Sequence, residues 1–254
     1  MKNADDLQVL VMTLKHRPDR YWYMLGMLDA MKFPFDKCHT VMGKYWRDYE
    51  DVGKIADEAI EDGFPWFERF KGREPKPYRG GYMSGLWSVC RCLRYISQQD
   101  SPYLITEDDR KFTFDWDDIL ERLGTLPQNA DTAILRDSAG ESYNKYWTKG
   151  TRPNDDGATM VIYSPVGAEK ALGIASSERS ITTWENIAKF CDNETTYCSS
   201  ERLYSSHPPF KVLSNTPGHM ADKIEFKGYG THAGYDRWVD GLDVSKGIVN
   251  EKRR

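Results

Sequence analysis

The stretch YLITEDDRKFTFDWDD, from Tyr103 to Asp118, decides the fold of this chain. A short apolar run leads directly into the carboxylates Glu107, Asp108 and Asp109, a pattern that predicts a buried strand ending in a charged turn. In an open α/β sheet, ligands bind just beyond the carboxyl ends of the strands. Because alternate residues of a strand share a face, we expect Glu107 and Asp109 to point one way and Asp108 the other.

Two carboxylates on one side of a strand end supply the hard oxygen ligands that Mg²⁺ and Mn²⁺ prefer. The competing interpretation is structural, because acidic residues also form solvated turns and cap the helix that follows. The stretch by itself does not distinguish a metal site from a capped turn. The segments before and after it are needed to choose between the two interpretations.

Composition places the chain among globular proteins with one large domain or two small ones. It has 254 residues, of which 39% are hydrophobic and 29% charged, and a net charge of −4, values that are ordinary for a soluble protein. The five cysteines lack CxxC spacing, which favours free thiols in a reducing compartment. Because there is no signal-peptide pattern and no apolar run that approaches a membrane span, we expect a cytoplasmic protein, in a bacterium or a phage-infected host, without a transmembrane segment.

Strands and helices alternate before the acidic stretch. The apolar run Val9–Leu14 predicts a buried parallel strand, and apolar residues at helical spacing follow it. Asp36–Met42 predicts a second strand, and the apolar stripe of Ser84–Ser97 predicts a helix. This order opens a nucleotide-binding α/β unit. Neither GxGxxG nor GxxxxGK[ST] is present, so the sequence supports neither a dinucleotide fold nor a P-loop.

The chain after the acidic stretch gives a weaker pattern. Thr132–Leu135 and Ala158–Tyr163 predict buried strands, and Asp117–Leu123 and Ser180–Phe190 predict helices. The polar stretch Ala139–Gly157 predicts a loop. Beyond residue 191 no clear pattern remains.

The segment FPWFERFKGREPKPYRGGYM, Phe64–Met83, interleaves basic with aromatic residues. Gly and Pro interrupt it repeatedly, which predicts a long loop. One interpretation is a solvated basic loop with a few packed aromatic residues. The other is a mobile flap that meets a polyanion, either a diphosphate or a nucleic-acid backbone.

Taken in order, these segments resemble glycosyltransferase family 25, the lipooligosaccharide and collagen galactosyltransferase group. The resemblance runs from residue 9 to residue 175 and rests on the order and spacing of four short motifs. They are the strand Val11–Leu14 with a turn ending at Arg20, the pair Gly43-Lys44 after Met42, the glycine-led helix Gly81–Ile96 before Tyr103–Asp109, and the strand and GA-x-x-L helix of Ala158–Leu172. The family's helix carries Ser-His where this chain has Ser84-Gly85, and the last third of the chain matches poorly.

The resemblance implies an α/β fold of the GT-A type, with a mixed sheet flanked by helices. It implies a single domain, with a donor-binding half over residues 1–125 and an acceptor half over residues 126–250. The implied reaction is sugar transfer, with inversion, from a nucleotide sugar, UDP-sugar first, assisted by Mn²⁺ or Mg²⁺. A divalent cation between the two phosphates stabilises the charge on the departing diphosphate.

Site residues are carried over from the same resemblance. Glu107 and Asp109 become the predicted metal ligands, directly or through water, with Asp108 nearer the ribose or the sugar. Inversion requires a carboxylate that takes the proton of the acceptor hydroxyl; Glu185 is the first candidate and Asp137 the second. The further predictions are His219 or His232 as a third metal ligand and Leu14, Arg17, Arg20, Lys44 and Arg79 as donor contacts.

Two acceptors remain open at this point. The resemblance favours a surface glycan such as lipopolysaccharide. A hydroxymethylated base in phage DNA is the other option, because the basic and aromatic residues of Trp66–Arg79 suit phosphate contacts and base stacking. The alternative class is a non-catalytic protein that binds glycan or nucleotide through a degenerate site.

Overall fold

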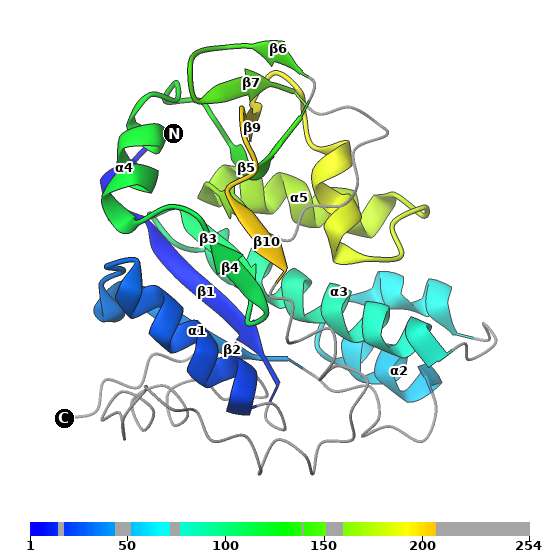
Figure 1. The fold of residues 1–254 in the computed structure, drawn as a ribbon. Coiled ribbons are helices and arrows are strands. Elements are labelled where there is room, and N and C mark those ends of the chain that lie inside the picture. The colour runs from blue at the N-terminus through cyan, green and yellow to red at the C-terminus, as the bar shows by residue number, and fades with distance from the viewer. Residues whose placement is uncertain (15–17, 44–51, 72–76, 139, 151–159, 207–254) are drawn as a thin grey trace.

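The computed structural model describes residues 1–14, 18–43, 52–71, 77–138, 140–150 and 160–206. These residues form one twisted sheet of eight strands with helices on both faces, and a separate pair of short strands (Figure 1). The strands of the main sheet are β1 (Gln8–Thr13), β2 (Cys38–Met42), β3 (Tyr103–Glu107), β5 (Thr132–Asp137), β6 (Glu141–Ser142), β7 (Trp147–Lys149), β8 (Met160–Tyr163) and β9 (Thr196–Ser199); the pair is β4 (Arg110–Phe112) and β10 (Tyr204–Ser206). The helices are α1 (Pro18–Ala30), α2 (Val52–Glu61), α3 (Pro77–Ile96), α4 (Trp116–Gly124) and α5 (Pro165–Ser177), with the 3₁₀ helices η1 (Ala4–Asp6), η2 (Phe35–Lys37), η4 (Pro65–Phe70) and η5 (Trp184–Phe190).

The order of the main sheet is β2-β1-β3-β8-β5-β9-β7-β6. Strand β1 lies parallel to β2 on one side and to β3 on the other, with Val11 opposite both Thr40 and Thr106. The chain therefore leaves β1 toward β2 and returns on the opposite side of β1 with β3. Such a reversal of strand order leaves a crevice beyond the carboxyl ends of the two strands.

Alternate residues of β1 divide the core between the two faces of the sheet. Val9 and Val11 belong to the buried cluster that includes α1 and α4, whereas Leu10 and Met12 belong to the cluster that includes α2, α3 and α5. Successive side chains of a strand point to opposite faces, so a strand buried on both sides consists of apolar residues throughout. This explains the uninterrupted apolar run at the start of the chain.

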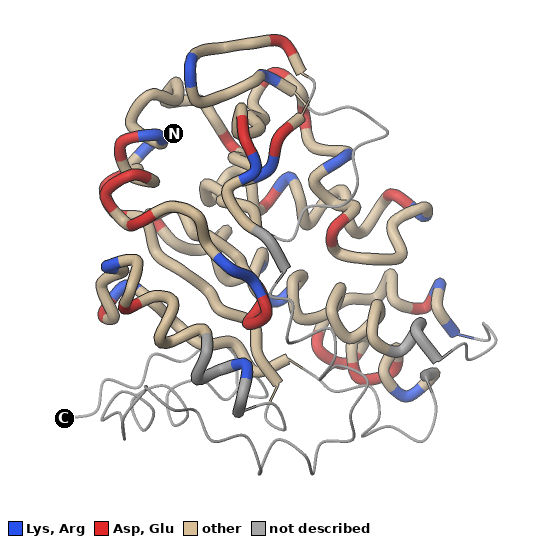
Figure 2. Tube along the Cα trace, in the orientation of Figure 1, with Lys and Arg blue, Asp and Glu red and all other residues tan. Residues whose placement is uncertain are grey.

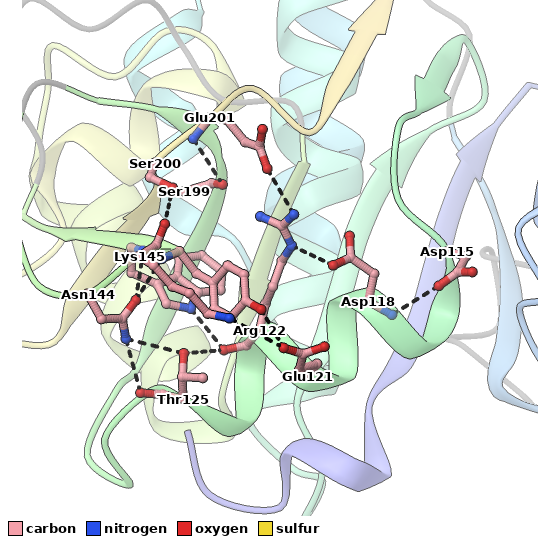
Figure 3. Close-up of polar contacts among 12 residues, drawn as sticks. Asp115, Asp118, Glu121, Arg122, Thr125, Asn144, Lys145, Ser199, Ser200 and Glu201 are labelled. Atoms are coloured by element: carbon pink, nitrogen blue, oxygen red, sulfur yellow. Dashed lines mark hydrogen bonds and ion pairs between the residues drawn. The ribbon is translucent and has the colours of Figure 1, made fainter.

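Arg122 of α4 connects this helix to the far end of the sheet (Figure 3). Its guanidinium donates to Asp118 at 2.9 Å and to Glu201 at 2.8 Å. Its backbone carbonyl accepts a 2.9 Å hydrogen bond from the indole of Trp147, which is fully buried on β7. The short strands at this end are thus held by side-chain contacts as well as by the sheet.

The predicted α/β class, a mixed sheet flanked by helices, is confirmed, and the arrangement is consistent with a GT-A-like fold. The strands predicted at Val9–Leu14, Asp36–Met42, Thr132–Leu135 and Ala158–Tyr163 are present as β1, β2, β5 and β8. Strand β8, from the second half of the chain, pairs with β3 from the first, so both halves contribute to one sheet. No helix within the described ranges has the length and apolar character needed to cross a membrane.

The loop predicted at Phe64–Met83 is wrong wherever the segment is described. Residues 65–70 form η4, in which Phe67 and Phe70 are buried, and α3 begins at Pro77, seven residues before the predicted helix. Both helices start with proline, which lacks the N–H that the first turn of a helix leaves unpaired. The prolines that suggested interruption therefore mark helix starts. Residues 72–76 lie outside the described part of the chain.

Two basic residues of this segment, Arg69 and Lys71, make internal contacts. Arg69 donates to the carbonyl oxygens of Ala175, Glu178 and Ile181 at 3.0–3.1 Å, at the carboxyl end of α5, where helix carbonyls lack partners within the helix. The ammonium of Lys71 lies 2.8 Å from a carboxylate oxygen of Asp57 and 2.8 Å from one of Glu68. In the described part of the predicted flap, Phe64, Phe67, Phe70 and Met83 are thus packed in the core.

Two further predictions need correction. The loop predicted at Ala139–Gly157 contains strands β6 and β7, and the helix predicted at Ser180–Phe190 is a 3₁₀ helix that begins at Trp184. Strands of two to four residues are too short to show an alternating pattern. Tertiary contacts such as that of Trp147 define them instead.

Two glycines of α5 give a matched test of packing. A Cβ atom on Gly167 would lie 2.1 Å from the carbonyl oxygen of Asp131, whereas one on Gly173 would meet nothing within 4 Å. We expect Gly167→Ala to lower the free energy of unfolding by about 1–3 kcal/mol. Gly173→Ala should raise it by up to about 1 kcal/mol, because alanine favours the helix interior. Urea unfolding of the two variants measures both; equal midpoints would contradict the packing of α5 against Asp131.

Candidate functional site

A cavity of about 250 Å³ lies at the carboxyl ends of β1, β2 and β3, where the strand order reverses. The ends of the parallel strands and the turn after β3 form one side of it, α3 forms another, and η5 approaches from the second half of the chain. Strands and the following turn contribute Met12, Thr13, Glu107 and Asp108, helix α3 contributes Gly81, Ser84, Gly85 and Ser88, and Leu14, Arg20, Gly43 and Trp184 complete the lining.

Asp108 ties the turn after β3 to the end of β1. Its backbone N–H donates to the carbonyl of Met12 at 3.0 Å, and its carboxylate accepts a 2.6 Å hydrogen bond from the hydroxyl of Thr13. Arg20, in the first turn of α1, lies 3.6 Å from the other carboxylate oxygen. Burial raises the pKa of Asp108 to about 7, and Arg20 and the Thr13 hydroxyl act against that rise. The cavity is thus lined by a buried acid whose ionised form is unfavourable in this environment.

Glu107 and Asp109 share Arg110 as an ion-pair partner. The Arg110 guanidinium binds the Glu107 carboxylate directly, and its Nε lies 3.3 Å from Asp109. Asp109 also lies 3.4 Å from Arg20. Figure 2 shows this acidic turn between β3 and β4, followed at once by the basic start of β4.

The expectation that Glu107 and Asp109 share a strand face is wrong. Strand β3 ends at Glu107, and the two aspartates form the turn to β4, so the alternation of a strand does not extend to them. Glu107 and Asp108 line the cavity, whereas Asp109 is not among its lining residues. Burial raises the pKa of Glu107 to about 7, the Arg110 charge opposes the rise, and the charges of Asp109 and Glu185 add to it.

Glu185, the first candidate for the base, lies in the first turn of η5. One of its carboxylate oxygens is buried and has no hydrogen-bond partner among the described residues. Its charge acts on Glu107, which places the two carboxylates in one electrostatic cluster. Asp137, the second candidate, is exposed at the end of β5, lies 3.3 Å from Arg202 and does not line the cavity. Glu185 is not among the lining residues of the cavity either, but it lies next to the lining residue Trp184 in the chain and acts on Glu107.

The residues of this cluster suit a cation chemically. The carboxylates of Glu107, Asp108 and Asp109 pair with the guanidinium groups of Arg20 and Arg110, and the charge of Glu185 acts on Glu107. The fully ionised cluster therefore carries excess negative charge. Carboxylate oxygens are the donors that Mg²⁺ and Mn²⁺ prefer. Within the described residues, however, no three His, Cys, Asp or Glu side chains gather as a metal-binding group. Metal binding stays a prediction.

The predicted donor contacts are only partly described. Leu14 and Arg20 line the cavity. Arg79 lies in the first turn of α3, and its side chain is outside the described set. Arg17, Lys44, His219 and His232 lie outside the described residues altogether.

The sequence prediction missed several residues that line the cavity, and it missed Arg110, which pairs with the acidic turn beside it. Thr13 could have been found, because it is the polar residue at the end of an otherwise apolar strand. Arg110, which immediately follows the acidic trio, gave a similar signal as a partner for those acids. Ser88 and Trp184 gave none, since only the packing of α3 and η5 brings them to the cavity, and Ser84 was noted only as the position of the family's Ser-His pair.

The fold and the cavity define an α/β protein with an acidic cavity at the ends of parallel strands. No protein-family model matches the chain, and no curated protein matches it. Among solved structures, the apo form of mouse xyloside xylosyltransferase 1 is similar over 72% of this chain and 80% of its own, at 12% sequence identity and a TM-score of 0.42. At this identity and TM-score, the similarity supports no inference about the family or the function of this chain. The resemblance to glycosyltransferase family 25 stays a prediction.

The hydrogen bond from Thr13 to Asp108 gives a direct test of the site's architecture. Thr13→Val keeps the shape of the side chain and removes the donor from a buried carboxylate. We expect the free energy of unfolding to fall by about 1–3 kcal/mol, while Thr13→Ser stays close to the wild type. Chemical denaturation at pH 8 measures the difference, and equal loss in both variants would show that the hydroxyl is not the cause.

The buried acids also predict the pH dependence of stability. The pKa values of Glu107 and Asp108 are about 7 in the folded chain and about 4 in unfolded chains. Between these values the folded state holds protons that the unfolded state has released. The contribution of these groups to the free energy of unfolding therefore falls as the pH rises from about 4 to about 7, and is constant above that. Asp108→Asn should make this decline shallower in urea unfolding curves recorded across the window; an unchanged slope would contradict the assignment.

Proposed function

We propose that this protein is a glycosyltransferase that moves a sugar from a nucleotide-sugar donor to an acceptor hydroxyl. One observation carries the proposal: the cavity lies at the reversal of strand order between β1 and β3 and is lined by the buried carboxylate of Asp108 and the half-buried carboxylate of Glu107. Ligands of open α/β sheets bind at such a reversal. The resemblance of the motifs to glycosyltransferase family 25 supplies the reaction class.

The β1–α1 side of the cavity suits the donor's phosphates. Helix α1 starts shortly after β1, and helix N-termini favour anionic groups through their free N–H groups and the helix dipole. Arg20, in the first turn, lines the cavity and is held in place by Asp108 and Asp109. A guanidinium fixed in this way can bind phosphate oxygens through two N–H groups. We propose a nucleoside diphosphate sugar, with UDP as the first nucleotide to test.

Glu185 is the residue we propose as the base. In an inverting transfer, the acceptor oxygen forms a bond to the anomeric carbon as the bond from that carbon to the diphosphate breaks, and the electron pair leaves with the diphosphate. The acceptor hydroxyl loses its proton to a carboxylate. The buried Glu185 oxygen without a hydrogen-bond partner has a lone pair available for that proton.

We propose that a divalent cation binds at the same cluster. Of the two predicted ligands, Glu107 lines the cavity, whereas Asp109 lies between Arg20 and Arg110. We therefore propose Glu107, together with the neighbouring Asp108, as the residues that would hold Mn²⁺ or Mg²⁺. When bound, the cation would neutralise charge on the departing diphosphate.

For the acceptor we favour a glycan over hydroxymethylated DNA. The DNA option depended on the basic and aromatic residues of Trp66–Arg79. Arg69 binds the end of α5, Lys71 pairs with two acids, and Phe67 and Phe70 are buried. These residues are engaged within the fold, which weakens the argument for DNA; Arg73, Lys76 and the side chain of Arg79 lie outside the described residues.

The test is turnover of a mixture of UDP-, GDP- and CMP-sugars in the presence of Mn²⁺, with mass spectrometry to identify the sugar released or transferred. We expect one donor to be consumed. Glu185→Gln should lower kcat at least about 100-fold, as expected for loss of a general base, and change the donor KM only slightly. Glu141→Gln, on the edge strand β6, is the matched control and should retain wild-type activity.

Two outcomes would count against these assignments. If no donor is hydrolysed or transferred with either Mn²⁺ or Mg²⁺, the chain is a non-catalytic binding protein. If Glu185→Gln keeps full activity while a donor is consumed, sugar transfer stands and another group accepts the proton.

A further inference from the structure

The second half of the chain reaches the cavity through η5. Among the described residues that line the cavity, Trp184 alone comes from beyond residue 108. It is the first residue of η5 and is 4% exposed. A Cβ atom on Gly85 of α3 would lie 3.3 Å from Cδ1 of the indole, so the ring packs directly against the helix that borders the cavity. The position of η5 therefore sets one wall of the cavity.

The link from α5 to η5, residues 178–183, contributes little to fixing that position. Most of its side chains are at least partly exposed, whereas Ile181 is fully buried. Within the described part of the chain, Thr183, which precedes η5, makes no capping hydrogen bond through its side chain. The hydrogen bonds of a 3₁₀ helix are also poorer in geometry than those of an α-helix. Contacts from elsewhere in the fold must fix where η5 begins.

Arg69 of η4 supplies such contacts. Its guanidinium donates hydrogen bonds at 3.0–3.1 Å to the carbonyl oxygens of Ala175, Glu178 and Ile181. One planar group thus joins the last turn of α5, the residue that follows this helix, and the buried residue three positions before Trp184. Carbonyls at the end of a helix lack partners within it and favour a cation. The charge on the donor strengthens each of these bonds.

Apolar packing continues the connection from the link to η5. Ile181, Trp184 and Ile187 belong to one buried cluster with Phe70, the residue that follows Arg69. The guanidinium carbon of Arg69 lies 5.0 Å from the centre of the Phe70 ring. Helix η4 therefore holds the backbone of the link through one side chain and its buried side chain through the next. Because close-packed interiors transmit displacements, a shift of Ile181 would be passed on to Trp184.

We infer that Arg69 is a positioning residue of the cavity, because it fixes the start of η5 and thereby the place of Trp184 and of Glu185 next to it. The inference rests on the proposed function only where it concerns the reaction. Arg69 is not among the described lining residues, so it acts through η5 and not on a ligand. The planar fork of a guanidinium can bind several carbonyls at once, whereas a lysine ammonium is a point charge on a flexible stem.

Native-state hydrogen exchange, followed by mass spectrometry, tests the positioning without any substrate. Arg69→Met removes the donors and keeps much of the apolar stem. We expect amides in residues 181–190 to exchange at least about tenfold faster than in the wild type, since several charge-assisted hydrogen bonds are lost. Amides of β8 should exchange as in the wild type, because the strands on both sides of β8 hold them.

Two further variants separate positioning from charge and from general destabilisation. Arg69→Lys keeps the charge and should restore only part of the slow exchange, because an ammonium cannot replace the fork. Arg94→Met is the matched control: Arg94 donates to the carbonyl and the carboxylate of Asp62, and its guanidinium lies 4.4 Å from the centre of the Phe64 ring. It should leave exchange in residues 181–190 within about twofold of the wild type. Thermal unfolding verifies that all three variants fold.

Turnover of the donor mixture tests the consequence for the reaction. Arg69→Lys should lower kcat about 10- to 100-fold, since a small displacement of groups at a site has an effect of this size. The donor KM should stay within about threefold of the wild type, because the phosphate contacts proposed for Arg20 lie on the β1–α1 side of the cavity. Arg94→Met should keep the wild-type kcat.

The other outcomes overturn the inference or the proposed function separately. Unchanged exchange in residues 181–190 of Arg69→Met, or equally fast exchange there in Arg94→Met, would overturn the inference whether or not the protein is an enzyme. Faster exchange with an unchanged kcat would reduce Arg69 to a structural residue. Full recovery of exchange and kcat in Arg69→Lys would show that charge alone matters, which also overturns it. If the wild type consumes no donor, the proposed function fails, and exchange alone decides whether Arg69 positions η5.

Discussion

The structure depends on the way in which Asp108 is held at the end of β1. Its backbone binds the Met12 carbonyl and its carboxylate binds the Thr13 hydroxyl, so the turn after β3 is fixed at the level where β1 ends. Arg20 then connects α1 to the same carboxylate. Without this tie the ends of the parallel strands would have no common floor. A ligand site at the reversal of strand order follows from one buried acid and its partners.

The same acid makes the site electrostatically demanding. Buried carboxylates are costly when ionised, and here Glu107 lies beside Asp108 with Glu185 close enough to act on it. Arg20 and Arg110 compensate part of this charge. A surplus of carboxylates over guanidinium groups is unfavourable for folding alone, and it is what a site for a cation and a proton-accepting reaction requires. The same few side chains therefore lower the stability of the fold and provide the groups on which the proposed function depends.

The central strands could be predicted from the sequence because each is buried on both faces, which leaves a continuous apolar run such as Val9–Leu14. The helix starts at Pro65 and Pro77 could not, since a proline that begins a helix looks the same in sequence as one that interrupts a chain. The acidic turn was located correctly. The prediction that Glu107 and Asp109 share a strand face was wrong, because β3 ends at Glu107 and three consecutive acids do not show in the sequence where a strand ends. Ser84 and Trp184 are 100 positions apart, and no local pattern brings such residues together.

The place of β8 in the sheet has a consequence for how this protein can be made or divided. Strand β8 lies antiparallel between β3 and β5, so the edge of β3 is covered only after the chain beyond residue 160 has been synthesised. A fragment ending near residue 125 would carry most of the cavity floor, yet it would present the backbone of β3 as an open edge ready to pair with other chains. The first 125 residues therefore lack the strand that covers β3, and evolution or engineering can exchange the second half of the chain only together with a strand that takes the place of β8.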